Sequence, residues 1–501
     1  MKKRILCMLL VLLFLLAALV GCKNEAPDTE DSGKATDVTD ATETSTNTES
    51  TVNDGDTLPT VDYGGKEYRI LSRTTTSYEF DPEKVSGDTL SNAIFTRNEQ
   101  VRSRYNVTLA IDETPGGWGD MGDFSEKYLN TVQSGWSPYS LVSAHFSVQM
   151  TCVVNGYTYD LTDIEYLDME KEWWSKQFYE DAQINGKFYI AVGDIAYTLY
   201  EYMQVVFFNE TLANNYIKDS TGEPIDFYEL VEEGEWTWEN FKKYSLAIPH
   251  TTEDDYGVIL QGHAARGFIT SCEISLTEAD TSGAFPIYSF PEVLPLRTTT
   301  FGDDFLDFVG NNAQVYFRKG GISEKDATDM FNKGSVLFYT QQLSEMVGIA
   351  DGLQTGNSYG LLPLPMYDDS QLEYHTVMRD SVSGVTIPKN IKDSEFVGLI
   401  TEALAMYSYQ EVRPTYYDVV MDGRYMVNEQ LSDMLDLLRR TIDVDFIMAY
   451  NSVLGKNPYS LLTNIYEYGN GANFTSNYEG QRGGYQSDLE SLYKFFGVNV
   501  K

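Results

Sequence analysis

The stretch EYRILS (residues 67–72) decides the fold, because it opens an alternation of strand-like and helical patterns. Two glycines precede it and a Thr-rich turn follows it, which is typical of the ends of a strand. Apolar residues at helical spacing come next over 90–105, followed by a second strand-like run over 106–111. A helical pattern over 124–132 and an apolar run over 139–142 complete the order. This β-α-β-α-β order predicts an open, parallel α/β sheet.

Helix caps and apolar stripes mark further elements downstream. Thr237 is placed to cap one helix, and Ser323 with Asp326 has the spacing of a capping box at the start of another. Apolar residues recur at helical spacing over 396–407 and again over 431–442. Both stripes predict helices that face the core.

The chain is strongly acidic and rich in aromatic residues. It has 501 residues, with 36 Lys and Arg against 75 Asp and Glu, for a formal net charge of -39. This length suggests two or three domains, and the charge excludes general nucleic-acid binding because it repels phosphate backbones. Anionic substrates are disfavoured too, unless a local basic pocket overrides the field. The 36 Tyr, 25 Phe and 6 Trp exceed what a core needs, so we expect many rings at a surface or in a cleft.

The amino terminus has the layout of a secretory signal. A basic start over 2–4 leads into an apolar run over 5–20, which is short for a membrane-spanning helix. Residues 19–22 (LVGC) resemble a bacterial lipobox, which implies removal of a signal peptide (1–21) and attachment of lipid to Cys22. The alternative is an ordinary signal peptide in which the cysteine falls by chance.

Residues 22–60 predict a disordered tether behind the lipidated cysteine. Between Thr29 and Thr51, 11 of the 23 residues are Ser or Thr, and few are apolar. Such a segment buries too little surface to offset the loss of chain entropy on folding. A glycosylated stalk is the alternative that the composition leaves open.

A search for motifs that carry chemistry finds none. The sequence has no P-loop, no HExxH, no GxSxG and no complete GxGxxG. The four histidines (His145, His250, His263 and His375) are too scattered to suggest a metal site. With 75 acidic residues, close carboxylate pairs are inevitable by chance and do not identify a glycosidase. We therefore expect no catalytic residues, no cofactor and no metal.

Six short stretches follow one another along the folded part: NGKFYIA (185–191), VVFFNE (205–210), GEWTWENF (234–241), FNKGSVLF (331–338), YGLLPLP (359–365) and VTIPK (385–389). In sequence and in order they resemble the family 1 extracellular solute-binding proteins of ABC importers. The resemblance extends from about residue 62 to the end of the chain. The chain is longer than the compact members of that family, so insertions are expected.

The resemblance implies an α/β, periplasmic-binding-protein-like (type II) fold, in which two lobes close by a hinge over a central cleft. Residues 62–196 and 366–410 would form the first lobe, and residues 197–365 and 411–501 the second. This division puts Cys152 and Cys272 in different lobes. A disulfide between them would lock the hinge, so we expect both thiols to be reduced.

The implied function is that of a lipid-anchored receptor on the extracytoplasmic face of the cell membrane. It would bind a carbohydrate of oligosaccharide size and deliver it to the transmembrane permease subunits of an ABC importer. A monomer without nucleic-acid partners is expected. Two other classes stay open: a surface glycoside hydrolase that uses a carboxylate pair, and a glycan-binding adhesin. Within the receptor class, a peptide or polyamine ligand is also open.

A sugar receptor needs flat aromatic platforms and planar polar side chains, and ligand sites in open α/β folds lie beyond the carboxyl ends of the strands. The candidates that follow strand ends, turns and inferred crossings between lobes are Arg73, Trp118, His145, Phe146, Tyr197, Glu201, Tyr202, Tyr339, Gln341, Arg379 and Asp380. Each has a structural alternative, as a core residue or as a surface residue. Trp173, Trp174, Trp236 and Trp238 are expected to be structural.

Overall fold

The structure is a computed structural model, and it describes residues 56–85, 87–117, 119–135, 137–317, 323–417, 428–444, 446–455, 457–468 and 473–498. The predicted signal peptide, Cys22 and almost all of the predicted tether lie outside the described residues, as does Trp118. Among the helices of the described part, none is both long and apolar enough to cross a membrane.

The first lobe is built on a four-stranded sheet with the order β12-β3-β1-β2. Three of its strands are parallel: β1 (Lys66–Arg73), β2 (Val107–Thr114) and β3 (Leu141–His145). Helices α2 (Asp88–Tyr105) and α3 (Met121–Gln133) connect them, and α4 (Phe146–Val154) follows β3. The predicted β-α-β-α-β order is thus confirmed. A wholly parallel sheet is the wrong expectation, because β12 (Ser383–Thr386) returns from the other lobe and runs antiparallel to β3.

The second lobe contains a five-stranded sheet with the order β10-β4-β9-β5-β8. The strands are β4 (Gln204–Asn209), β5 (Tyr256–Leu260), β8 (Val315–Phe317), β9 (Val336–Gln342) and β10 (Tyr359–Leu362). Strand β4 comes directly from the first lobe and is antiparallel to both neighbours, whereas β5 is parallel to β8 and β9. In both sheets, the strand that arrives from the other lobe runs against the strands beside it.

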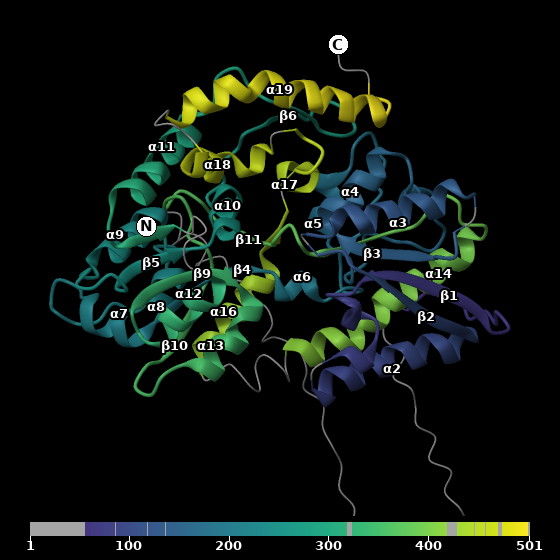
Figure 1. Cartoon of the computed structure of the whole chain (residues 1–501), viewed down its shortest axis with the longest axis horizontal. Coiled ribbons are helices and arrows are strands. Elements are labelled where there is room, and N and C mark those ends of the chain that lie inside the picture. Colours follow the sequence, from purple (N-terminus) through teal and green to yellow (C-terminus); the bar gives the residue numbers. More distant parts are fainter. Residues whose placement is uncertain are drawn as a thin grey trace, which may run out of the picture. The chain divides into compact units, whose positions relative to one another are not determined.

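The remaining elements cover these sheets or join them (Figure 1). The helices are α5 (Lys176–Ala182), α6 (Thr198–Glu201), α7 (Glu210–Tyr216), α8 (Phe227–Glu232), α9 (Trp238–Ala247), α10 (Gly262–Ser271), α11 (Leu296–Asn311), α12 (Glu324–Asn332), α13 (Met346–Gly352), α14 (Ser394–Tyr407), α16 (Glu429–Arg440), α17 (Phe446–Tyr450), α18 (Leu461–Tyr468) and α19 (Phe474–Phe495). Short strand pairs are β6 (Glu278–Asp280) with β7 (Ile287–Ser289), and β11 (Thr376–Val377) with β13 (Ile442–Asp443).

The predicted caps and stripes are confirmed, with one exception. The Thr237 hydroxyl accepts a hydrogen bond from the Asn240 amide at 3.4 Å, and Ser323 and Asp326 form a reciprocal capping box. The stripe over 396–407 is buried in α14. The helix predicted over 431–442 is wrong at its end. Helix α16 stops at Arg440, and Ile442 and Asp443 form the short strand β13, which pairs with β11.

The chain crosses between the sheets in a segment that contains α6. Ala191 pairs with Val385 of β12 in the first lobe, and Gln204 of β4 pairs with Gln342 of β9 in the second. Between these two points α6 lies at the junction of the lobes (Figure 1). Every backbone group buried at such a crossing needs a partner, and pairing at both ends provides partners. The crossing is therefore held from both lobes.

The second crossing begins later than residue 366. The Met366 amide donates to the Trp236 carbonyl at 3.2 Å, and the Gln371 side chain donates to the Ser271 carbonyl at 2.8 Å. These are contacts with second-lobe elements. Met378 then bridges to Met203 on the first crossing before the chain enters β12. These contacts favour a boundary near 378, and the full set of lobe boundaries stays a prediction.

The carboxyl-terminal helix α19 contacts both lobes, although 411–501 was assigned to the second lobe alone. At its start, the Phe474 amide donates to Asp303 of α11 at 2.9 Å. Just past its end, the Phe496 carbonyl accepts from the Asn185 side chain at 3.1 Å, and the Phe496 ring lies 5.6 Å from that of Tyr189. Helix α19 thus spans from one lobe to the other (Figure 1).

Most aromatic rings lie inside the protein, so few of them are at its surface, and the expectation that many line a cleft stays a prediction. Among the described aromatic residues, only Phe95, Tyr216 and Phe285 are largely exposed. Trp238 illustrates the reason, because its ring packs within 6 Å of the rings of Phe241, Phe268, Phe301, Phe305 and Phe308. Aromatic side chains fill the volume that aliphatic ones fill in other cores.

Both cysteines of the described chain are free and buried, as expected. Cys152 lies in α4, and Cys272 follows α10. Burial raises the pKa of each thiol to about 12, which keeps both protonated and unreactive at neutral pH.

We predict that the chain from residue 56 onward, alkylated in denaturant without a reductant, gains two labels by intact mass. The folded protein should gain none, because both thiols are covered. A denatured sample without labels would show that the two cysteines are joined, which contradicts this structure.

Candidate functional site

Most of the predicted site residues meet where the chain crosses between the lobes, and we call this group the crossing cluster. It consists of Arg73, His145, Tyr197, Glu201, Tyr202, Arg379 and Asp380. Arg73 ends β1, and its guanidinium donates to the Ser381 carbonyl at 2.5 Å and to the Ser383 hydroxyl at 3.2 Å. His145 ends β3, directly opposite Ser383 on β12. Two strand ends of the first lobe thus face the returning chain.

Two side-chain contacts tie the crossing cluster to the second lobe. Arg266 of α10 forms an ion pair with Asp380 at 3.0 Å, and both side chains are largely buried. Arg379 donates to the Gln342 side chain of β9 at 3.1 Å, while its amide donates to the Tyr202 carbonyl at 2.9 Å. Groups from both lobes and from both crossings therefore lie together.

Helix α6 carries acidic and aromatic groups on the side that faces the first lobe. The Glu201 carboxyl accepts from the Tyr78 hydroxyl at 2.6 Å, and the ring of Tyr197 lies 5.5 Å from that of Tyr78. Burial raises the pKa of Glu201 to about 8, so this carboxyl is mostly protonated at neutral pH. Burial also raises the pKa of Glu79, which accepts from the Thr198 amide at 3.0 Å.

The crossing cluster is locally basic within an acidic protein. Burial lowers the pKa of His145 to about 4, and the charges of Arg73, Arg379 and Arg266 favour the same neutral form against the opposing Asp380. With His145 neutral, the three guanidinium groups face the carboxylate of Asp380 and the carboxyls of Glu79 and Glu201, whose pKa values burial raises. The field of the whole chain is thus locally reversed.

Tyr339 and Gln341 lie apart from the crossing cluster, inside the second lobe. The Tyr339 hydroxyl is joined to the Gln341 amide at 3.1 Å and to the Gln261 amide at 3.2 Å, and its ring is fully buried. Gln341 also contacts His263 at 2.7 Å. Phe146 is buried too, with its ring 5.4 Å from that of Phe178. Neither Tyr339 nor Phe146 exposes a ring face here, and their role as platforms stays a prediction.

A cavity of about 310 Å³ lies on the other side of α6, and we call it the basic cavity. The residues that line it are Glu172, Trp173, Trp174, Ser175, Lys176, Gln177, Gly193, Asp194, Leu199, Tyr200, Arg413, Arg439, Arg440 and Ile442. They come from the segment before α5 and the start of that helix, from the first crossing, and from the chain after α14. The basic cavity therefore also lies between segments assigned to different lobes.

One buried carboxylate holds the tryptophans of this cavity. Glu402 of α14 accepts from the indole N–H of Trp173 at 2.8 Å and from that of Trp174 at 2.9 Å. The two tryptophans are buried, and their purely structural role stays a prediction. Burial raises the pKa of Glu402 to about 7, against the lowering effect of the two indole hydrogen bonds.

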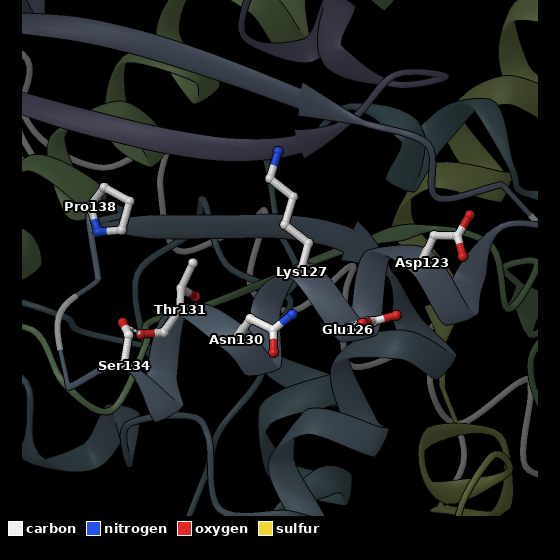
Figure 2. Close-up of a pocket in the computed structure, with 7 residues that line it drawn as sticks. All are labelled: Asp123, Glu126, Lys127, Asn130, Thr131, Ser134 and Pro138. Carbon is white, nitrogen blue, oxygen red and sulfur yellow. Dashed lines mark hydrogen bonds between the residues drawn. The ribbon is translucent and has the colours of Figure 1, made fainter.

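Two other hollows differ in character. A cavity of about 280 Å³ between α5, α10 and α17 is lined by Asp181, Glu273, His375 and Asp443, among others. Another hollow, of about 540 Å³, is open and lies on one face of α3, with Pro138 beside it (Figure 2). It has no aromatic lining and belongs to one lobe only, so it lacks what a sugar site needs. Within the described residues, no group of three or more His, Cys, Asp or Glu is arranged to hold a metal.

Several residues of the site were not predicted. Tyr78, Glu79 and Arg266 contact the crossing cluster or the helix that carries part of it, and Arg413 and Arg440 line the basic cavity. One usable signal was present for Arg266, a charged residue inside the otherwise apolar stretch of α10. The other contacts join residues far apart in the chain and leave no local pattern.

Several solved structures share this fold, and one of them is the sugar-binding protein of an ABC transporter. The galacto-N-biose/lacto-N-biose I-binding protein of Bifidobacterium longum matches with a TM-score of 0.55 at 14% identity, over 88% of this chain and all of that one. UgpB of Mycobacterium tuberculosis, in complex with glycerophosphocholine, matches with a TM-score of 0.53 at 14% identity, over 86% and 99%. Maltose-bound MalE3 of T. maritima matches with a TM-score of 0.51 at 11% identity, over 85% and 100%. The chain has the two-lobe α/β fold of these proteins.

No protein-family model and no curated protein sequence matches this chain.

We predict that Glu402 makes the stability of the protein depend on pH. Its pKa is about 7 in the folded state against an ordinary value of 4.5, so the folded state binds the proton more tightly than the unfolded state. This contribution is fully present below the ordinary pKa and is lost as the pH rises through 7. Relative to Glu402→Gln, which cannot ionise, the wild type should lose about 3 kcal/mol of unfolding free energy between pH 4.5 and 8.

Denaturant unfolding of both proteins across this range measures the difference, with the exposed Glu126→Gln as a control that should stay parallel to the wild type. Parallel curves for Glu402→Gln and the wild type would contradict the assignment.

Proposed function

We propose that the protein is the substrate-binding receptor of an ABC importer and that it binds a carbohydrate between its two lobes. The observation that carries the proposal is the crossing cluster, where polar and aromatic groups of both lobes and both crossings meet. Such a position lets a ligand touch both lobes at once, so that its binding energy favours a closed arrangement. The sugars bound by proteins of the same fold support this ligand class.

The chemistry of the crossing cluster suits hydroxyl groups. Guanidinium and amide groups such as those of Arg379 and Gln342 donate several hydrogen bonds in one plane, and the protonated Glu201 can both donate and accept. The half-buried ring of Tyr202 is placed to offer an apolar face to the C–H side of a sugar. Binding by these groups needs no covalent step, and we propose that the solute is released unchanged to the permease.

We further propose that the protein acts on the extracytoplasmic face of the membrane, held there by lipid on Cys22. The lipobox-like residues 19–22 and the polar segment behind them support this anchor. One lipid-modified cysteine with a long tether would leave the two lobes free to close and to reach a permease.

Calorimetry with a panel of oligosaccharides tests the proposal. At least one member should bind with micromolar affinity, and its chain length should be unchanged after incubation. Tyr202→Ala should weaken that binding at least tenfold, about 1.4 kcal/mol, because it removes a half-buried ring from the crossing cluster.

Tyr216→Ala is the matched control, since Tyr216 is exposed on α7 and should not affect affinity. Cleavage products would favour a glycoside hydrolase instead. No binding to any saccharide would refute the proposed function.

A further inference from the structure

The basic cavity combines a ligand-sized volume with an unusual charge. Its volume of about 310 Å³ is at the lower end of the range for small-molecule sites. Lys176, Arg413, Arg439 and Arg440 line it against only two acidic residues, Glu172 and Asp194. The chain as a whole has a net charge of -39, whereas basic side chains outnumber acidic ones around this cavity. Their gathering calls for a negatively charged counterpart.

The two acidic residues do not supply that counterpart. Asp194 is buried at the base of the cavity, where it accepts from the Tyr200 hydroxyl and lies 3.5 Å from Arg413. Burial raises the pKa of Asp194 to about 7, so part of its charge is absent at neutral pH. Glu172 already accepts from the Tyr409 hydroxyl. Lys176 is paired with Glu170 at 2.8 Å and with Glu180 at 3.7 Å, so Arg439 and Arg440 are the cations that the two acidic lining residues leave without a carboxylate.

The guanidinium groups at the rim keep donors available. Among the described residues, Arg439 forms an ion pair with Asp436, an exposed neighbour three residues earlier on α16, at 3.1 Å, and its guanidinium lies 5.5 Å from the centre of the Tyr417 ring. Arg440 is exposed and forms no hydrogen bond or ion pair within the described chain. Guanidinium groups present parallel N–H donors that match the two oxygens of a carboxylate or a phosphate. Exposed pairs such as Arg439 with Asp436 are weak and give way readily to a better acceptor.

The same cavity offers surfaces for the body of a small molecule. Trp173, Trp174 and Tyr200 contribute aromatic edges, and Ser175 and Gln177 contribute polar groups. Glu402 fixes both indoles through their N–H groups, so these walls are rigid. Aromatic walls beside oxyanion donors fit a compact, hydroxylated molecule that carries one acidic group.

We propose that the basic cavity is a binding site for a small oxyanion-bearing molecule of the sugar-acid or sugar-phosphate class. The site is separate from the crossing cluster, because Tyr197 and Glu201 occupy the side of α6 toward Tyr78, whereas Leu199 and Tyr200 occupy the side toward the cavity. The occupant would touch the first-lobe segment before α5 and the end of α16 together. It would thus bind at the junction of the lobes, independently of whether the crossing cluster takes a neutral sugar.

Calorimetry at low and moderate salt tests this site, with glucuronate, glucose 6-phosphate, glucose and inorganic phosphate as probes. Glucuronate or glucose 6-phosphate should bind, and binding should weaken as salt rises. Glucose should not bind in the cavity, and inorganic phosphate should bind less tightly than the sugar that carries the same group. The double variant Arg439→Gln/Arg440→Gln should weaken the charged probe at least tenfold.

Lys325→Gln is the matched control, because Lys325 is 82% exposed on α12 and changes the net charge without touching the cavity. It should leave the affinity unchanged. Both arginines are on the surface, and circular dichroism of the double variant should match the wild type.

Several results would overturn the proposal: no charged probe binds, inorganic phosphate binds as tightly as the sugar phosphate, or Lys325→Gln weakens binding as much as the double variant. A neutral oligosaccharide that still binds in that case leaves the proposed function intact and removes only this second site.

Discussion

The structure depends on a constraint on the backbone: the chain passes between two sheets, and each crossing must be hydrogen-bonded in both. Ala191 pairs with Val385 in one lobe, and Gln204 pairs with Gln342 in the other. Met203 and Met378 bridge the two crossings to each other. Because a buried backbone group without a partner costs free energy, these pairings leave little freedom for the residues between them. The short helix α6 lies between these pairings, which therefore fix where its side chains are placed.

The electrostatics of the junction follow from the burial of that interval. Acidic groups pressed between the lobes lose water, and the pKa of Glu201 rises to about 8 and that of Asp194 to about 7. Arginines remain charged in the same surroundings. The junction thus becomes basic in a protein whose surface is acidic. The basic character of the junction therefore has two sources: the arginines themselves, and the carboxyl groups whose negative charge is reduced by burial.

Local patterns in the sequence predicted the parts of the fold that have local causes. The order of β1, α2, β2, α3 and β3, and both helix caps, follow from residues within a few positions of one another. The family resemblance suggested two crossings, which brought Tyr197, Glu201 and Tyr202 near the first and Arg379 and Asp380 near the other into the set of candidates. The prediction that the helix reaches residue 442 is wrong. Ile442 pairs with Thr376 of β11, a strand more than sixty residues away in the sequence, and no local pattern indicates that pairing.

Properties that depend on distant contacts could not be predicted in the same way. Arg266 and Asp380 are 114 positions apart, and neither neighbourhood indicates the other. Tyr339 follows the expected strand, but the side chains of Gln261 and Gln341 enclose its hydroxyl inside the lobe. The high aromatic content suggested exposed rings that could serve as platforms. Many of the rings instead pack against one another in the core, as around Trp238. Residue type alone does not tell whether a ring fills a core or lines a cleft.

The central claim is that two lobes close around a solute held at their junction. Small-angle scattering of the chain from residue 56 onward, with and without a saccharide that calorimetry shows to bind, tests this most directly. The account predicts a smaller radius of gyration for the bound protein, with the change lost when the saccharide is removed. A saturated complex whose scattering curve equals that of the free protein would contradict it.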